Sequence, residues 1–102
     1  MAKDFQTIIN DINSHLAKSG RRYYSDFYIG ITDDVERGMF TEHNVVRGKS
    51  WWIYRTATDP DTARNIETHF LEKGMRGDKD KDKGDDTDKI VYCYAVSPIT
   101  IE

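Results

Sequence analysis

The stretch that decides the fold is Phe27-Tyr28-Ile29-Gly30-Ile31-Thr32-Asp33-Asp34-Val35-Glu36-Arg37. Its first half is short and apolar, which is typical of a strand. Thr32 or Asp33 can cap a following helix, predicted over about 33–43, that carries Arg37 in its first turns. Tyr28 at the strand and Arg37 at the helix start would then point to one small volume. Because helix N-termini and guanidinium groups both favour anions, we expect that volume to suit a phosphate.

The segment before this stretch predicts a helix and the start of the strand. Apolar residues recur at helical spacing over 4–18, and Gly20 ends that pattern. The following residues, 23–31, are rich in aromatic and β-branched side chains, which indicates a strand.

The segment after it predicts a strand, a helix and a final strand. Residues 51–57 form the second strand, and Asp59 begins a helix that runs to about Lys73. A third strand is predicted over 89–96, after a charged flexible loop at 75–88. The chain is therefore predicted to be α+β, with a small, mostly antiparallel three-stranded sheet flanked by three helices.

Length and composition indicate a single domain over residues 1–102. The net charge of −3 argues against a broadly basic nucleic-acid protein but allows a local basic patch. Cys93 is the only cysteine, so it cannot form an intrachain disulfide, and we expect a small buried side chain. No apolar run is long enough to cross a membrane, and no signal-peptide pattern begins the chain. We therefore expect a soluble, cytoplasmic protein without a membrane partner.

Glu67 is a candidate metal ligand on the last predicted helix. It lies four residues after Ala63 and three before Phe70, so it borders the face expected to be buried. One interpretation is a salt bridge at the rim of the helix, with Arg37 or Arg55 as the partner. The other is a single-carboxylate Mg²⁺ or Mn²⁺ site, since Mg²⁺ often takes only one or two protein carboxylates.

The histidines and large aromatic residues allow two interpretations each. His15 and His69 are expected at the surface, whereas His43 follows the helix of Arg37 and is either a capping residue or part of a site. Tyr28 is either a packed strand tyrosine or a group that positions a water at a phosphodiester. Trp51 and Trp52 must point to opposite faces of one strand, one of them free to stack on a base or contact a protein.

Residues 28–37 resemble the second half of the signature of the GIY-YIG nuclease superfamily. In that family a Tyr-Ile-Gly strand leads into a helix with an essential arginine and a later histidine. A strand and a helix with an alanine and a metal-binding glutamate follow, as do 51–57 and Ala63 to Glu67 in this chain. The resemblance covers roughly residues 27–73.

The resemblance implies hydrolysis of nucleic-acid phosphodiesters with one Mg²⁺ or Mn²⁺ ion. Glu67 would bind the metal, Tyr28 would position the water, and Arg37 would stabilise charge on the phosphate, with His43 as the later histidine. Phosphate contacts would come from the local cations Arg21, Arg22, Arg37, Arg47, Lys49 and Arg55.

The chain departs from the family pattern at two places. The opening Gly-Ile-Tyr strand, expected about ten residues before Tyr28, is replaced by the end of the first helix. Our hypothesis is that Ile90–Val96 fills the vacant place beside Tyr28, so that Tyr92 or Tyr94 replaces the missing tyrosine. The family arginine also falls at Gly38, one residue after Arg37, which turns Arg37 about 100° around a helix. An alternative is therefore a catalytically inactive module that binds a protein partner or acts as a regulator.

Overall fold

The computed structural model describes residues 2–20, 23–41, 43, 45, 51–77 and 89–96. Its elements, in chain order, are α1 (Phe5–Ala17), η1 (Tyr24–Asp26), β1 (Phe27–Thr32), η2 (Glu36–Thr41), β2 (Trp52–Thr56), α2 (Pro60–Glu72) and β3 (Ile90–Ala95). The predicted α+β class is confirmed. Within the described ranges, no helix is both long and apolar enough to span a membrane.

The three strands form one antiparallel sheet in the order β1-β3-β2. The last strand of the chain therefore lies in the centre, and β1 and β2 each pair with it. In this register Tyr28 is opposite Tyr94, which in turn is opposite Trp52. The expectation that the C-terminal strand lies next to Tyr28 is confirmed.

Both α-helices begin at the aspartates that their sequences place there. The Asp4 carboxylate accepts a hydrogen bond from the Thr7 N–H at 2.8 Å, and Asp59 does the same for Thr62 at 2.7 Å. These bonds satisfy backbone donors that a helix N-terminus would otherwise leave open. Hydrogen bonds from the side chain and the N–H of Thr7 lower the pKa of Asp4, and those from the N–H and the side chain of Thr62 lower the pKa of Asp59.

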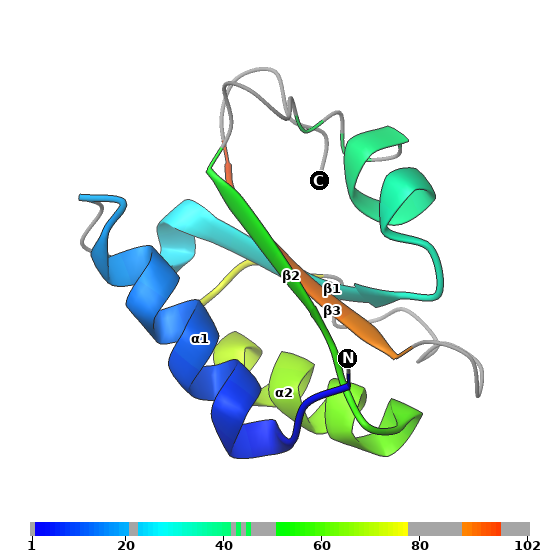
Figure 1. Cartoon of the computed structure of the whole chain (residues 1–102). Helices are drawn as coiled ribbons and strands as arrows, with labels where there is room; N and C mark the ends of the chain where they lie inside the picture. The colour runs from blue at the N-terminus through cyan, green and yellow to red at the C-terminus, as the bar shows by residue number, and fades with distance from the viewer. Residues whose placement is uncertain are drawn as a thin grey trace.

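α1 and α2 pack against one face of the sheet and form the main core. In Figure 1 they lie together on one side of the three strands, with η2 on the other side. The core residues of α2 predicted from helical spacing, Ala63, Ile66 and Phe70, are all fully buried. Cys93 points into this core, and burial raises the pKa of its thiol, as expected for a small apolar side chain.

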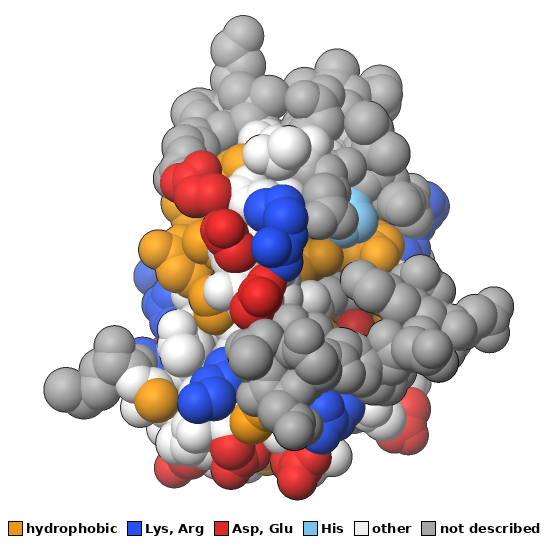
Figure 2. Space-filling view, turned by 90° about the vertical axis from the view of Figure 1, so that its right-hand side faces the viewer, with side chains coloured by type: hydrophobic (Ala, Val, Ile, Leu, Met, Phe, Trp, Pro, Cys, Tyr) orange, Lys and Arg blue, Asp and Glu red, His pale blue; other side chains and the backbone are white. Residues whose placement is uncertain are grey.

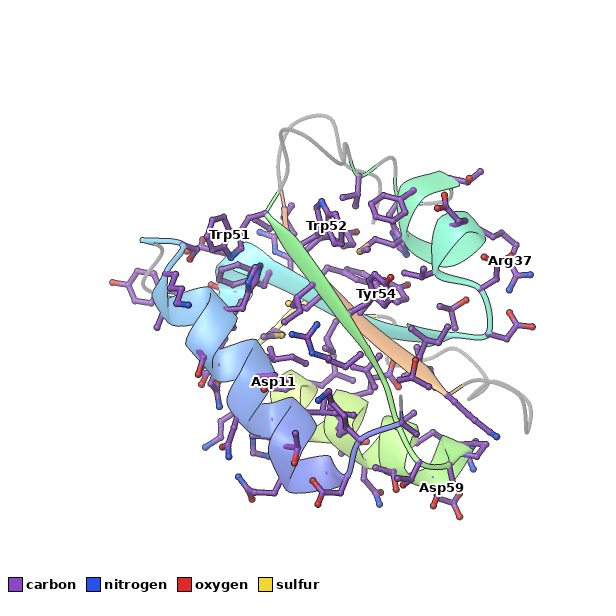
Figure 3. The ribbon with its side chains drawn as sticks, viewed as in Figure 1. Asp11, Arg37, Trp51, Trp52, Tyr54 and Asp59 are labelled. Atoms are coloured by element: carbon purple, nitrogen blue, oxygen red, sulfur yellow. The ribbon has the colours of Figure 1, made fainter. Side chains whose placement is uncertain are left out.

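A second, smaller cluster fills the space between the sheet and η2. It contains the buried residues Tyr28, Met39, Val45, Tyr92 and Tyr94, with Val35, Phe40, Trp52 and Val96 packed around them. The two faces follow from the pleat of the strands, because neighbouring residues point to opposite sides. As predicted, Trp51 and Trp52 divide between the two clusters, Trp51 toward α1 and Trp52 toward η2 (Figure 3).

Three boundaries differ from the prediction. The strand expected from residue 23 begins at Phe27, because Tyr24–Asp26 forms a 3₁₀ turn. The helix expected over 33–43 is a π-helix of six residues, Glu36–Thr41. Residues 75 and 76, expected in the loop, are held by the fold: Met75 is buried and Arg76 pairs with the outer edge of β1. Residues 78–88 lie outside the described part of the chain.

Candidate functional site

Four aromatic side chains meet on the sheet face that η2 covers. We call Tyr28, His43, Tyr92 and Tyr94 the tyrosine–histidine cluster. Tyr28 comes from β1, the other two tyrosines come from adjacent inward positions of β3, and His43 comes from the segment after η2. The structure therefore brings together two residues predicted as site residues, Tyr28 and His43, with both tyrosines of the C-terminal strand.

His43 is held through both nitrogens of its ring. Its Nε2 lies 2.9 Å from the Tyr92 hydroxyl, and its Nδ1 lies 3.0 Å from the Tyr94 hydroxyl. A neutral imidazole has one N–H and one lone pair, so it donates to one of these hydroxyls and accepts from the other. The arrangement can move a proton between the two tyrosines through His43. His43 is thus part of a buried network rather than a helix cap.

Stacking fixes the rings of the cluster relative to one another. The Tyr28 ring centroid lies 4.7 Å from that of His43 and 5.3 Å from that of Tyr94, with 20° between the two tyrosine planes. Tyr28, Tyr92 and Tyr94 are at most 7% exposed. Rings packed this tightly have one conformation available, which keeps the imidazole in place between its two hydroxyl partners.

Gly30 gives the Tyr92 ring its place. The two residues are register partners on β1 and β3. A β-carbon added at Gly30 would lie 2.5 Å from the ζ-carbon of Tyr92, closer than two carbons can approach. The glycine of Tyr-Ile-Gly therefore leaves the space in which the end of the Tyr92 side chain lies.

The start of η2 is not an anion site, which corrects the expectation of a phosphate there. The Asp34 carboxylate accepts hydrogen bonds from the N–H groups of Glu36 and Arg37, at 3.0 and 3.3 Å. A carboxylate thus occupies the positions that a phosphate would need. Asp34 is also the residue that caps the helix, in place of Thr32 or Asp33; the Thr32 hydroxyl accepts from the Asp34 N–H at 3.1 Å.

Arg37 lies on the exposed side of η2. Its guanidinium pairs with Asp33, four residues earlier, and its side chain is 55% exposed. Figure 3 shows it at the outer side of η2, away from Tyr54 and Trp52. Its neighbour Gly38 is buried against β1, where an added β-carbon would lie 2.7 Å from the Thr32 hydroxyl oxygen. A side chain at the family's arginine position would collide with the sheet.

Glu67 is buried, at 5% exposure, on the flank of α2 that also carries Leu71. The contacts of Gly77 locate this flank, since a β-carbon there would meet both Leu71 and Ile29. Glu67 therefore lies one helical turn from a residue at the edge of β1. Its helix belongs to the layer opposite the tyrosine–histidine cluster. In the described ranges no group of three or more His, Cys, Asp or Glu gathers as metal ligands.

The expected phosphate-binding cations are described only in part. Arg55 points to the α-helical face, where its Nε donates to Asp11 at 3.0 Å. Arg21, Arg22, Arg47 and Lys49 lie outside the described residues. On the face drawn in Figure 2, the described Lys and Arg side chains lie beside Asp and Glu side chains rather than in one basic patch.

His15, predicted at the surface, is only partly exposed, because one side of its ring is covered. Its ring stacks on Trp51 at 4.6 Å, and its Nε2 is buried without a hydrogen-bond partner. Burial lowers the pKa of His15, helped by the nearby positive charges of Arg55 and Lys18, while a hydrogen bond with the Trp52 backbone acts in the opposite direction. Helical spacing could not reveal this, because the contact is made with the edge of another element.

Comparisons with protein-family models, with curated proteins and with solved structures find no match to this chain.

Proposed function

We propose that this chain is a GIY-YIG-like domain that hydrolyses phosphodiester bonds in nucleic acid. The observation that carries the proposal is the position of Tyr92. Its ring lies over Gly30 of the Tyr-Ile-Gly strand, and its hydroxyl is hydrogen-bonded to His43. A tyrosine from a neighbouring antiparallel strand is what the family's opening Gly-Ile-Tyr strand would supply. In this chain the C-terminal strand supplies it.

The proton chemistry would depend on Tyr92 and His43. A water held by the Tyr92 hydroxyl can lose a proton to that oxygen, while Tyr92 passes its own proton to Nε2 of His43, 2.9 Å away. Tyr94, bonded to Nδ1, would position the imidazole and stabilise its charged form. Tyr28, stacked on His43, would act as a positioning residue rather than touch the water.

Glu67 fits the metal that the family resemblance implies. Glu67 is a buried carboxylate on α2, and carboxylate oxygen is the ligand type that Mg²⁺ and Mn²⁺ prefer. A single carboxylate suffices for Mg²⁺, which keeps several of its waters. Glu67 would hold the ion, and the ion would supply charge neutralisation for the phosphate. α2, which carries Glu67, lies on the opposite side of the sheet from the cluster, with β1 and Arg76, which pairs with the outer edge of β1, between them.

A cleavage assay with Mg²⁺ or Mn²⁺ tests the proposal on single-stranded and duplex DNA and on RNA, with EDTA as the blank. We expect Glu67→Gln and Tyr92→Phe each to lower the rate about 10²-fold or more. Glu72→Gln, an exposed glutamate on the same helix, and Tyr23→Phe, an exposed tyrosine, are the matched controls. If all five proteins cleave equally, the activity is a contaminant and the proposal fails.

A second candidate function is a catalytically inactive module that binds a protein partner. The observation in its favour is that no arginine lies where the family has one. Gly38 takes that position and is buried against Thr32, while the neighbouring Arg37 pairs with Asp33 at the surface. Loss of one group that stabilises developing charge typically costs about 10²–10³ in rate. For this candidate, the folded wild-type protein shows no cleavage under any metal condition, and restoring an arginine near the cluster does not create any.

A further inference from the structure

We propose that the exposed ring of Tyr54 is a stacking site for an unpaired base of a single-stranded nucleic acid. The inference rests on the proposed function and names the substrate class of that site. Tyr54 is on β2, on the face that carries the tyrosine–histidine cluster, and it is 39% exposed. Among the described residues it is the one exposed large aromatic side chain on this face.

One side of the Tyr54 ring is supported by other rings. It stacks on Trp52, with 6.1 Å between ring centroids and 13° between planes. Trp52 in turn meets the edge of Phe40 from η2, at 5.0 Å and 88°. Tyr54 is therefore held in one orientation before a ligand arrives, which lowers the entropy lost on binding. In Figure 3 Trp52 and Tyr54 both point from β2 toward η2.

The other side of the ring faces short side chains. The strand register places Tyr54 beside Tyr92 and Gly30, and the next residues on the same face are Thr56, Ile90 and Thr32. The side chains of the two threonines and the isoleucine extend less far from the sheet than those of the two tyrosines. Thr56 and Ile90, which follow Tyr54 and Tyr92 on this face, are both partly exposed. We infer that a flat group can lie against the Tyr54 ring above them.

The free edge of β2 does not suit a peptide strand. Its outward carbonyl at Tyr54 accepts from Nη1 of Arg55 at 2.8 Å, and its carbonyl at Thr56 accepts from the Lys3 N–H at 2.8 Å. A strand added from a partner or from a second copy would have to displace both donors. A ligand that uses the face of the ring displaces neither. A nucleobase is such a ligand, since every base has a flat π-face.

The position of Tyr54 relative to Tyr92 connects the base to the reacting phosphate. Side chains directly opposite on antiparallel strands have β-carbons about 4.5–5.5 Å apart, and Tyr54 and Tyr92 are such a pair. The Tyr92 hydroxyl lies over Gly30 of β1, so a strand whose base stacks on Tyr54 of β2 would have to cross β3 to bring a phosphate to that hydroxyl. Bases in a duplex already stack on each other, so the expected substrate is single-stranded or locally unpaired.

Binding without hydrolysis tests the inference. The full-length protein is titrated in EDTA and low salt into a fluorescein-labelled oligothymidylate of about ten nucleotides, a length within the usual site sizes. We expect Tyr54→Ala to raise Kd about tenfold or more, and Tyr54→Phe to stay within about twofold, because stacking needs the ring and not the hydroxyl. Tyr23→Ala, which removes an exposed tyrosine outside this face, is the control. Circular dichroism verifies that each variant is folded.

A second probe separates stacking from attraction to phosphates. An abasic oligomer of the same length carries the same charge but has no bases, and we expect it to bind about tenfold more weakly. Equal affinity for the two oligomers, an unchanged Kd in Tyr54→Ala, or no binding by the wild type overturns the inference. So does a dimer that dissociates in Tyr54→Ala, which would make the ring a contact between copies. If binding depends on the bases but neither the wild type nor any variant cleaves the oligomer, the stacking site is supported and only the proposed hydrolysis is refuted.

Discussion

The end of the Tyr92 side chain occupies the space that a side chain at Gly30 would need, although 62 residues separate the two in the chain (92 − 30). The glycine and the tyrosine face each other across β1 and β3. The Tyr92 hydroxyl is also bonded to His43, so the ring cannot move aside without losing that bond. This relationship links the Tyr-Ile-Gly strand to the last strand and to the histidine.

Gly30→Ala is expected to destabilise the protein by about 1–3 kcal/mol, the usual cost of adding a methyl group to a packed site. Urea denaturation followed by tryptophan fluorescence measures the change in the free energy of unfolding. The same substitution in a Tyr92→Ala background should cost much less, because the colliding ring is gone. An equal cost in both backgrounds would show that Tyr92 is not the cause.

Tyr94→Phe is expected to lower the free energy of unfolding by about 1–3 kcal/mol, since it removes a hydroxyl from a fully buried ring and leaves Nδ1 of His43 without that partner. Tyr23→Phe, at a position 67% exposed, should change stability by less than about 0.5 kcal/mol. Chemical denaturation of the two variants beside the wild type gives both values. Similar small effects would contradict a hydrogen bond that holds His43.

His15 should make stability depend on pH near neutrality. Burial lowers its pKa in the folded protein, so the unfolded chain binds the proton more readily. Its contribution is then fully present above the unfolded pKa of about 6.5 and is lost as the pH falls toward the lowered folded value. Between neutral and mildly acidic pH, the melting temperature should fall less in His15→Phe than in the wild type. This variant keeps a ring against Trp51. Identical declines would contradict a lowered pKa for His15.

The cap of α2 gives an acid dependence of its own. The hydrogen bond from the Thr62 N–H lowers the pKa of Asp59, so its stabilising effect is present above the ordinary Asp value of 3.8 and is lost as the pH falls through the lowered value. Asp59→Ala should lower the melting temperature at neutral pH, while Asp59→Asn, which can still accept the bond, should lower it less. In acid the difference between wild type and Asp59→Asn should shrink. Melting curves of the wild type, Asp59→Asn and Asp59→Ala at neutral and at acidic pH measure these differences.

Cys93 should be inert in the folded protein. It is 1% exposed in the main core, and burial raises the pKa of its thiol, so almost no thiolate forms near neutral pH. Alkylation by iodoacetamide, followed by mass spectrometry, should proceed only as fast as the protein unfolds and should become rapid in urea. Fast labelling of the native protein would mean that β3 leaves the sheet easily, which its central position makes unexpected.

Local patterns in the sequence were sufficient for the α-helices and for the faces of the strands. The caps Asp4 and Asp59 and the buried residues of α2 follow from short-range rules of spacing and capping. The opposite faces of Trp51 and Trp52 follow from the alternation of side chains along a strand. The same rules failed at η2, because nothing in a six-residue pattern distinguishes a π-helix that packs Gly38 against Thr32 from an ordinary helical turn.

The sequence by itself determined the α+β class, the starts of α1 and α2, and the alternating pattern that puts Tyr92 and Tyr94 on one face of the last strand. Only the tertiary structure decided that this strand inserts between β1 and β2, and that His43 bonds to two hydroxyls 49 and 51 residues away. It also decided that Arg37 pairs with Asp33 and that His15 is covered by Trp51. The reason is that spacing rules describe neighbours within one helix or strand, whereas contacts between distant segments depend on how whole elements pack together.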